Sequence, residues 1–397
     1  MTGILFWIGV FGIFYVYAGY PLLLTALARI FPRRSKKMGI EPGVTLLISA
    51  YNEEDVIAQK LENSLALDYP IENLQILVAA DGSDDRTVEI VESFASHDVE
   101  LSFSPLRRGK MAAINHAMQS VRNEIVLFSD ANNMYDSVLL RKLVGSFNDP
   151  KVGAVSGSKV VMSGDSALGD TEGLYWKYES FIKSQEAKLE SCTAVAGEVY
   201  AIRRNLYVRP PDTIINDDFY VALQILRQGY NIDYVPSARS FEKVSQTEQD
   251  EIMRRTRIVA GRYQALSLSF GLLPFHRPLL LWQIVSHKYL RPMVPFGMIL
   301  VFIANLTAVL FVSQQGPRPL LYLHSPFGII FLVLQVIFYL LAWLGKRWHP
   351  GGFLGKLLYI PTFLVNSNLA ALYGLINYVT GKQTVVWKRA SRRSSAS

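Results

Sequence analysis

Two adjacent carboxylates, Asp217 and Asp218, stand at the start of a stretch with helical periodicity, and Asn216 separates them from the apolar pair Ile214 and Ile215. A carboxylate at the mouth of a pocket can act as a general base, removing the proton from an attacking hydroxyl. The same placement suits a helix cap, because Asn and Asp oxygens accept hydrogen bonds from the unpaired backbone N–H groups of a first turn. Both interpretations of Asn216-Asp217-Asp218 stand at this point.

Four further polar clusters follow short apolar segments that have the composition of buried strands. The segments are 44–49, 74–79, 101–104 and 124–129, and the clusters after them are Tyr51 to Glu53, Asp81, Arg108 to Lys110, and Asp130 to Asn132. Helix-patterned stretches alternate with these segments, which predicts an α/β fold with a mostly parallel, Rossmann-like sheet. Ligands bind outside the carboxyl ends of the strands in such sheets. The sequence therefore predicts one ligand site built from these clusters.

Three of these clusters also have a simpler interpretation when each is taken alone. Asp81 with Gly82 is a common turn pair, and Asp130 would cap a following helix. Lys110 would be a solvent-facing residue of a first helical turn, although a cation is disfavoured there unless an anion lies near. None of these interpretations accounts for all the clusters in their order.

Several function classes lack their sequence signatures. No G-x-G-x-x-G follows the first predicted strand, and no G-x-x-x-x-G-K-[ST] occurs, which disfavours dinucleotide oxidoreductases and P-loop nucleotidases. The histidines lack zinc-ligand spacing, and the single cysteine, Cys192, excludes an intramolecular disulfide. No basic helix is interleaved with aromatic residues, so we expect no nucleic-acid partner. Two acidic strand ends with one lysine suit a metal-chelated diphosphate.

Long uncharged segments flank this region and indicate a membrane protein. Residues 1–28, 296–312 and 326–344 carry no charged side chain, and each is close to the roughly 20 residues that cross a bilayer as a helix. The basic run 33–37 follows the first segment, which predicts a cytoplasmic location for the domain after it. The net charge of +7 comes mostly from such juxtamembrane residues, which suit anionic membrane lipids.

These features predict a multi-pass protein of the cell (inner or plasma) membrane. The predicted parts are a transmembrane helix at 1–31, a cytoplasmic domain at 40–270, an interfacial helix region at 271–290, transmembrane or re-entrant helices at 291–380, and a basic cytoplasmic tail at 381–397. Pro361 and Asn366 interrupt the last apolar run, so we favour a re-entrant hairpin or an interfacial helix there over a kinked span. Either form keeps the tail cytoplasmic.

The ordered motifs of residues 40–265 resemble the processive, membrane-embedded members of glycosyltransferase family 2. That group holds the cellulose, chitin, hyaluronan and poly-N-acetylglucosamine synthases. The resemblance implies a GT-A fold, a UDP-sugar donor, Mg²⁺ or Mn²⁺, and inverting transfer that forms a β-linkage. By the family's motifs, Tyr51 and Glu53 hold the nucleobase and ribose, Asp81 lies at the uracil, and Lys110 lies near the donor phosphates.

The resemblance also implies roles for the remaining acidic residues. Asp130 and Asn132 occupy the D-x-D position at the metal, where Asn132 provides a neutral amide oxygen that hard cations accept. Asp218 matches the catalytic base of the family's T-E-D motif. Asp217 orients that base or contacts the acceptor, and adjacent carboxylates raise the pKa of one of them.

Arg254 to Ile258 fall where the family has Q/R-x-x-R-W. We expect Arg254 and Arg257 to cover the diphosphate, because a planar guanidinium binds phosphate oxygens in pairs. A basic helix that faces solvent or lipid headgroups is the alternative. Ile258 replaces the tryptophan that lines the acceptor end in the family, and it offers apolar contact without stacking on a sugar ring.

Three more residues are candidates for the acceptor side. Gly197 permits a close approach, Glu198 would back the acceptor pocket, and Trp176 lies on a long amphipathic helix where packing is the alternative. The resulting prediction is β-glycosyl transfer from a nucleotide-sugar to a growing polysaccharide. Transfer of one sugar to a lipid acceptor is the nearer alternative, and an inactive membrane scaffold or transport subunit the more distant one. No residue pattern specifies a partner subunit.

Overall fold

The chain folds into two compact units in a computed structural model. The model describes residues 1–33, 39–162, 167–243, 248–311, 319–348, 352–384 and 386. One unit comprises 1–23, 252–263 and 284–380, and the other comprises 24–251, 264–283 and 381–397. The basic residues at 34–37 and those of the tail at 388–393 lie outside the described residues, so their predicted roles stay predictions.

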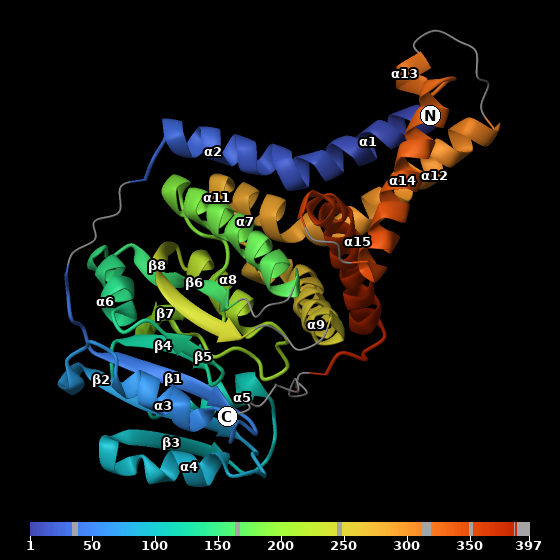
Figure 1. Cartoon of the computed structure of the whole chain (residues 1–397). Coiled ribbons are helices and arrows are strands. Elements are labelled where there is room, and N and C mark those ends of the chain that lie inside the picture. The colour runs from blue at the N-terminus through green and yellow to red at the C-terminus, as the bar shows by residue number, and fades with distance from the viewer. Residues whose placement is uncertain are drawn as a thin grey trace. The chain divides into compact units, whose positions relative to one another are not determined.

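The larger unit is built on a mixed sheet (Figure 1). Its strands are β1 Val44–Ala50, β2 Leu74–Asp81, β3 Val99–Ser104, β4 Ile125–Asp130, β5 Asn133–Tyr135, β6 Val152–Met162, β7 Tyr200–Arg203 and β8 Asn231–Lys243. They form one sheet of eight described strands in the order β3-β2-β1-β4-β7-β6-β8-β5. The pairs β3–β2, β2–β1, β1–β4 and β6–β8 are parallel. β7 pairs antiparallel with both of its neighbours, β4 and β6, and β5 pairs antiparallel with β8. The predicted mostly parallel α/β fold is confirmed.

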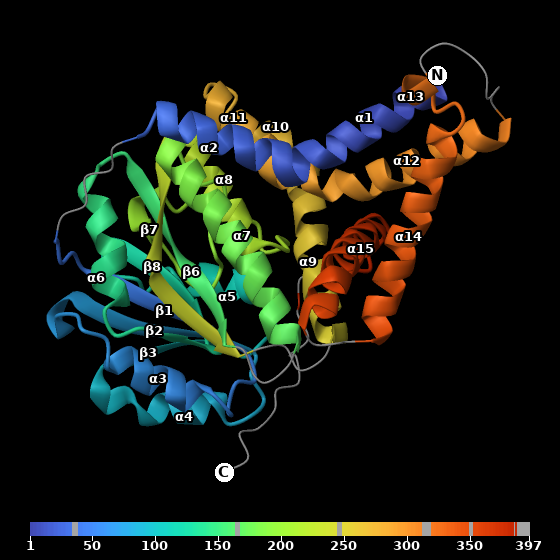
Figure 2. The ribbon, with the colours of Figure 1, turned by 45° about the horizontal axis from the view of Figure 1, so that its top comes forward.

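Helices cover both faces of this sheet (Figure 2). They are α3 Ile57–Leu65, α4 Thr87–Ser93, α5 Lys110–Ala117, α6 Leu139–Val144, α7 Ala167–Leu189 and α8 Asp217–Arg227. Val44, Leu46 and Ile48 of β1 share one buried core with Ile57 of α3 and Leu139 of α6, while α5 packs against β1, β2 and β3. Because both faces are covered, β1 is buried along its whole length, which explains its nearly continuous apolar sequence.

The second half of the sheet departs from the predicted strand limits. β6 and β8 pair with each other well beyond 157 and 236, so both are longer than their apolar patterns indicate. Residues 195–199 precede β7 instead of forming part of it. Just before and within this stretch, side chains accept backbone hydrogen bonds: the N–H of Thr193 donates to Glu186 and that of Ala196 to Ser156.

The other described elements are mostly apolar helices. They are α1 Thr2–Phe14, a π-helical turn Tyr15–Gly19, α2 Tyr20–Ile30, α9 Glu248–Ser267, α10 Ser269–Leu272, α11 Pro278–Ile284, a second π-helical turn Val285–Tyr289, α12 Val294–Phe311, α13 Pro319–Tyr322, α14 Phe327–Arg347 and α15 Gly352–Val379. Within the described residues, four helical runs are long and apolar enough to cross a membrane: Thr2–Ile30, Pro278–Phe311, Phe327–Arg347 and Leu357–Val379.

The structure bears on two of the predicted membrane elements. The run Pro278–Phe311 is one candidate span, and the interfacial helix region at 271–290 stays a prediction. α15 is one continuous helix through Pro361, which excludes the hairpin and leaves the kinked span and the interfacial helix as predictions. Pro361 lacks the N–H that would bond to the carbonyl of Leu357, and the Thr362 hydroxyl bonds to the next carbonyl, that of Leu358.

Candidate active site

Lys110 lies at the centre of the predicted strand-end site. Its Nζ is 2.7 Å from Asp130 Oδ1, at the carboxyl end of β4, and 3.4 Å from Asp217 Oδ2, at the start of α8. The Lys110 side chain is only 14% exposed, so these carboxylates are its main surroundings. Three polar residues predicted from separate clusters are therefore brought together by the fold.

Asp81 fixes the turn that aims Lys110. Its two carboxylate oxygens accept hydrogen bonds from the backbone N–H groups of Arg108 and Gly109, each at 2.8 Å, and the residue is buried. Gly109 has a φ of +101°, which favours glycine, and α5 begins directly after it. The structure thus gives Asp81 a part in positioning the lysine, and its predicted contact with a nucleobase stays a prediction.

The charges around Lys110 shift the pKa values of the lysine and of Asp130 in opposite directions. Burial alone would lower the pKa of Lys110, but Asp130 and Asp217 outweigh it and the pKa is raised. Burial alone would raise the pKa of Asp130, but its ion pair and hydrogen bond with Lys110 hold that pKa below the ordinary value. Both groups are therefore charged at neutral pH.

Asp218 has the opposite protonation behaviour. Burial, followed by repulsion from the neighbouring Asp217, raises the pKa of Asp218 from 3.8 to about 7. Such a value lets a carboxylate accept and release a proton near neutral pH, as a general base must. The Oδ1 atom of Asp218 accepts from the N–H of Phe219 at 2.6 Å, which fixes one oxygen.

Gly197 lies against the other oxygen of Asp218. A Cβ atom at position 197 would lie 3.0 Å from Asp218 Oδ2 and 3.4 Å from its Cγ. The predicted close approach at Gly197 is thus an approach to the carboxylate of Asp218, and its role toward the acceptor itself stays a prediction.

The two helix-cap alternatives have different outcomes. Asn216 occupies the N-cap position of α8 and its side chain makes no capping hydrogen bond, but Asp218 Oδ1 accepts from the first-turn N–H of Phe219. Asp130 is followed by β5 rather than by a helix, so it caps none. The Lys110 ammonium contacts both Asp130 and Asp217.

The predicted nucleotide end lies at the carboxyl end of β1. The guanidinium of Arg107 stacks over the ring of Tyr51, 3.6 Å from its centroid. Glu53 is buried, and its backbone N–H donates to the Thr87 hydroxyl at 2.7 Å. The contacts of Tyr51 and Glu53 with a nucleobase and ribose stay predictions.

The donor set at Asp130 and Asn132 suits a hard divalent cation. The described residues contain no group of three or more His, Cys, Asp or Glu side chains arranged to hold a metal. Asp130 provides one carboxylate and Asn132 one amide oxygen. Mg²⁺ is commonly held by one or two carboxylates together with substrate phosphates and waters. The pKa of Asp130 is held below its ordinary value, so this carboxylate is in the ionised form that a metal ligand requires. The residues present therefore fit the predicted Mg²⁺ or Mn²⁺.

Two charged residues beside Asn132 escape prediction from the sequence. Lys159 of β6 pairs with Glu242 of β8 and lies 3.5 Å from Glu198, and its Nζ is 5.3 Å from the centroid of the Trp176 ring. A lysine within an otherwise buried strand is a signal that could have found this cluster. The acceptor roles predicted for Glu198 and Trp176 are not tested by these contacts.

Arg254, Arg257 and Ile258 lie on α9, in the part of the chain that belongs to the smaller unit. Within that unit the neighbouring Arg255 donates to the Ser367 hydroxyl of α15 at 3.1 Å and stacks over Phe363. The diphosphate role of Arg254 and Arg257 and the acceptor role of Ile258 stay predictions.

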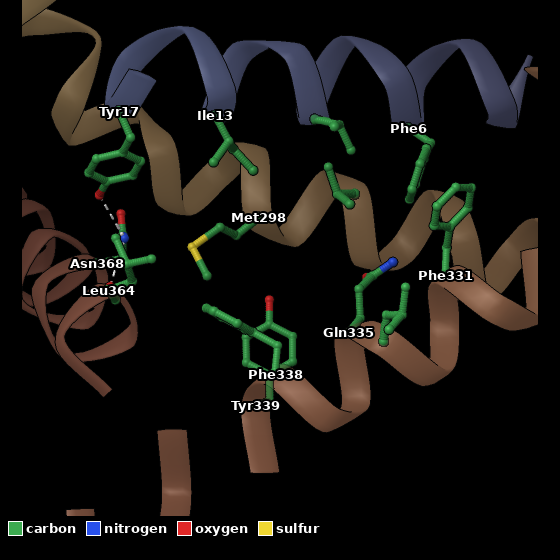
Figure 3. A pocket seen from close by; sticks show the side chains of 13 residues that line it. Phe6, Ile13, Tyr17, Met298, Phe331, Gln335, Phe338, Tyr339, Leu364 and Asn368 are labelled. Atoms are coloured by element: carbon green, nitrogen blue, oxygen red, sulfur yellow. Dashed lines mark hydrogen bonds between the residues drawn. The ribbon is translucent and has the colours of Figure 1, made fainter. Parts of the chain in front are cut away.

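An apolar cavity of about 330 Å³ lies among the helices of the smaller unit (Figure 3). Its lining comes from α1, the π-helical turn Tyr15–Gly19, α12, α14 and α15. Asn368 donates to the Tyr17 hydroxyl at 3.1 Å on one wall, and the Tyr339 hydroxyl points into the cavity from α14 (Figure 3). A long apolar body with a polar group at one end would suit this lining.

Comparisons with known proteins show what the chain is similar to. The family model described as "Glycosyltransferase like family 2" matches residues 42–261. The poly-beta-1,6-N-acetyl-D-glucosamine synthase of Staphylococcus aureus (strain MSSA476) is 28% identical over 235 residues, which are 57% of this chain and 56% of the synthase. The chain thus spans just over half the length of that relative. The probable glycosyltransferase YdaM of Bacillus subtilis (strain 168) is 26% identical over 295 residues, 70% of each chain.

One solved structure shares the fold over nearly the whole chain. It is the mannosyltransferase PcManGT from Pyrobaculum calidifontis in complex with GDP-Man and Mn²⁺, with a TM-score of 0.70 and 22% identity, over 96% of this chain and 100% of that one. At this identity the likeness concerns the fold, and it confirms the predicted GT-A type.

Proposed function

Because the chain belongs to glycosyltransferase-like family 2, we propose that it is a membrane-integrated, inverting transferase that moves a sugar from a nucleotide-diphospho-sugar to an acceptor hydroxyl. The carrying observation is the arrangement around Lys110: an ionised Asp130 on one side, and Asp218 with a pKa raised to about 7 near the other. Inverting transfer needs this combination, namely a base for the acceptor and a charged cradle for the departing diphosphate.

Asp218 takes the proton from the acceptor hydroxyl as that oxygen attacks the anomeric carbon. Asp217 keeps the Asp218 carboxyl basic enough for this task by repulsion, and Gly197 leaves room for its oxygen. Lys110 neutralises charge that develops on the leaving diphosphate, as a lysine near phosphates does. Asp130 and Asn132 would hold Mg²⁺ or Mn²⁺, which supplies further neutralisation of the diphosphate when it is bound.

We take a growing polysaccharide as the acceptor. The synthase relative is named for a poly-β-1,6-N-acetyl-D-glucosamine product, which supports UDP-GlcNAc or another UDP-sugar as the donor. The four candidate spans and the basic residues after the first of them support a membrane enzyme whose catalytic unit faces the cytoplasm.

A membrane lipid is the second candidate acceptor. The observation that favours it is the apolar cavity among the helices of the smaller unit, because a lipid acceptor must place its hydrocarbon chain in an apolar environment while its hydroxyl or phosphate is glycosylated. The departure at Ile258 from the processive motif supports the same alternative. The product would then be a lipid that carries one added sugar.

The test is a donor screen on the full-length protein in lipid nanodiscs with Mn²⁺. UDP-glucose, UDP-galactose, UDP-GlcNAc, UDP-glucuronate and GDP-mannose are offered separately, and nucleoside diphosphate release is followed with product sizing. We expect release with one donor or a few, and a product that is retained as a polymer.

The outcomes separate the candidates. A single sugar on a lipid that organic solvent extracts would replace the polysaccharide with a lipid acceptor. No release with any donor would favour an inactive scaffold or transport subunit. Release that persists at the same rate after treatment with EDTA would exclude the metal requirement.

A further inference from the structure

Glu242 lies against the D-x-D segment although it is far from it in sequence. The antiparallel ladder of β5 and β8 pairs Asn133 with Glu242, so the glutamate stands beside the residue that follows Asn132. Asn132 Nδ2 donates to Glu242 Oε1 at 2.7 Å. The backbone register, rather than a flexible side chain alone, sets this contact.

The contact with Glu242 fixes which end of the Asn132 amide can face a bound cation. A carboxylate only accepts hydrogen bonds, so the amide nitrogen must face Glu242 and the oxygen must face elsewhere. An aspartate at position 132 would instead place two negative oxygens at this short distance, which is unfavourable. Glu242 therefore suits an asparagine at the second position of the motif and disfavours the usual aspartate.

Further charges hold Glu242 in place. Lys159 pairs with its other carboxylate oxygen, Oε2, and lies 3.5 Å from Glu198. The Lys159 side chain is 5% exposed, so it has little freedom to leave. Glu242 itself is 20% exposed, and a carboxylate held in this way keeps its orientation.

We propose that Glu242 is a positioning residue for the divalent cation of the donor: it orients the Asn132 amide so that its oxygen serves as a ligand, and it supplies, one hydrogen bond further out, the negative charge that the D-x-D position lacks. The proposal rests on the metal site of the proposed function. A partner that orients a metal ligand in this way typically changes metal affinity by about 10- to 100-fold when it is removed.

The test measures Mn²⁺ binding rather than transfer. Full-length protein in nanodiscs is titrated with Mn²⁺ in the presence of UDP, with GDP in parallel, and free Mn²⁺ is followed by its electron paramagnetic resonance signal. We expect Glu242→Ala to weaken Mn²⁺ binding about tenfold. Glu242→Gln should weaken it less, because the glutamine oxygen still accepts from Asn132 although the charge is lost.

A matched control uses an acid far from the motif. Glu100 lies on β3, pairs with Arg122 and accepts from Gln75, so Glu100→Ala removes a comparable hydrogen-bonded carboxylate. We expect Mn²⁺ binding within twofold of wild type for it. Unchanged Mn²⁺ binding in both Glu242 variants would overturn the proposal.

A double-mutant cycle separates orientation from simple packing. In the Glu242→Gln background, Asn132→Asp restores a hydrogen bond in the reverse direction, since the glutamine nitrogen donates to the new carboxylate. We expect Asn132→Asp to strengthen Mn²⁺ binding by a much larger factor there than in the wild-type background. Equal factors in the two backgrounds would mean that Glu242 does not orient residue 132.

The control on the proposed function is the wild-type titration itself. Wild-type protein that binds no Mn²⁺ with either nucleotide contradicts the metal site as a whole. Wild-type protein that binds Mn²⁺, together with variants that bind it equally well, contradicts the role of Glu242 alone.

Discussion

The carboxyl end of β4 and the start of α8 are both acidic and both face Lys110, yet their carboxylates differ in protonation. Asp130 accepts a direct hydrogen bond from the ammonium at 2.7 Å, and its pKa is lowered. Asp218 has no such bond to the lysine, and burial with repulsion from Asp217 raises its pKa to about 7. One cation thus leaves one carboxylate permanently charged and the other able to exchange a proton.

The difference separates two tasks that the same residue type performs. A charged carboxylate suits a bound cation, and a carboxylate with a pKa near 7 suits proton transfer. The direct hydrogen bond from Lys110 to Asp130, and burial with repulsion from Asp217 at Asp218, set these two protonation states, and the proposed function assigns one task to each. The predictions below test that separation, beginning with the largest expected effect.

Replacing the base should separate transfer from donor binding. Asp218→Asn removes the proton acceptor, so we expect turnover to fall about a thousandfold, in line with the contribution of general bases. Donor affinity, measured by calorimetry, should stay within a few-fold of wild type. Asp98→Asn, at an exposed turn before β3, is the control and should keep full turnover. Near-native turnover of Asp218→Asn would make the assignment of the base wrong.

Removing the shared cation should affect both acidic segments. Lys110→Met leaves Asp130 and Asp217 without their ion pairs, and the diphosphate loses a positive charge. We expect nucleoside diphosphate release to slow about a hundredfold, as when one preorganised group at a developing charge is removed. The exposed Lys177 of α7 provides the control Lys177→Met. A change of less than twofold for Lys110→Met would place the lysine outside the reaction.

The raised pKa of Asp218 should be visible in the pH profile. The base must be unprotonated to act, so kcat/KM for the donor should fall as the pH drops through about 7, the pKa of Asp218 in the free protein. Asp217→Asn removes the like charge that favours the protonated form, which lowers the pKa of Asp218. The acidic limb of the profile should therefore move to lower pH. A limb that stays in place or moves upward would contradict the coupling of the two carboxylates.

The smallest effect should come from crowding the base without changing any charge. In Gly197→Ala the new Cβ atom would lie 3.0 Å from Asp218 Oδ2, and the carboxylate must shift by a few tenths of an ångström. We expect turnover to fall roughly several-fold, because catalysis depends steeply on the placement of the base. Gly271→Ala meets nothing within 4 Å and should leave turnover unchanged. Equal turnover in both variants would show that the base tolerates displacement.

The sequence alone determined the class of fold and the edge of the sheet at which a ligand site is predicted. Apolar strand segments alternate with helical stretches, and parallel strands with covered faces must be apolar along their length. The polar residues at their carboxyl ends therefore contrast with the apolar strands. Lys110, Asp130, Asp217 and Asp218 are all predicted from the sequence as members of one site. Uncharged runs long enough to cross a bilayer likewise predict most of the candidate spans, because that signal lies within each run of the sequence.

The tertiary structure decided what depends on contacts between distant segments. The register of β5 and β8 brings Glu242 to Asn132, more than a hundred positions earlier, and no local pattern encodes that pairing. The opposite pKa shifts of Asp130 and Asp218 depend on which carboxylate lies within hydrogen-bond distance of Lys110. Local patterns follow from the chain itself, whereas protonation follows from distances that only the folded chain sets.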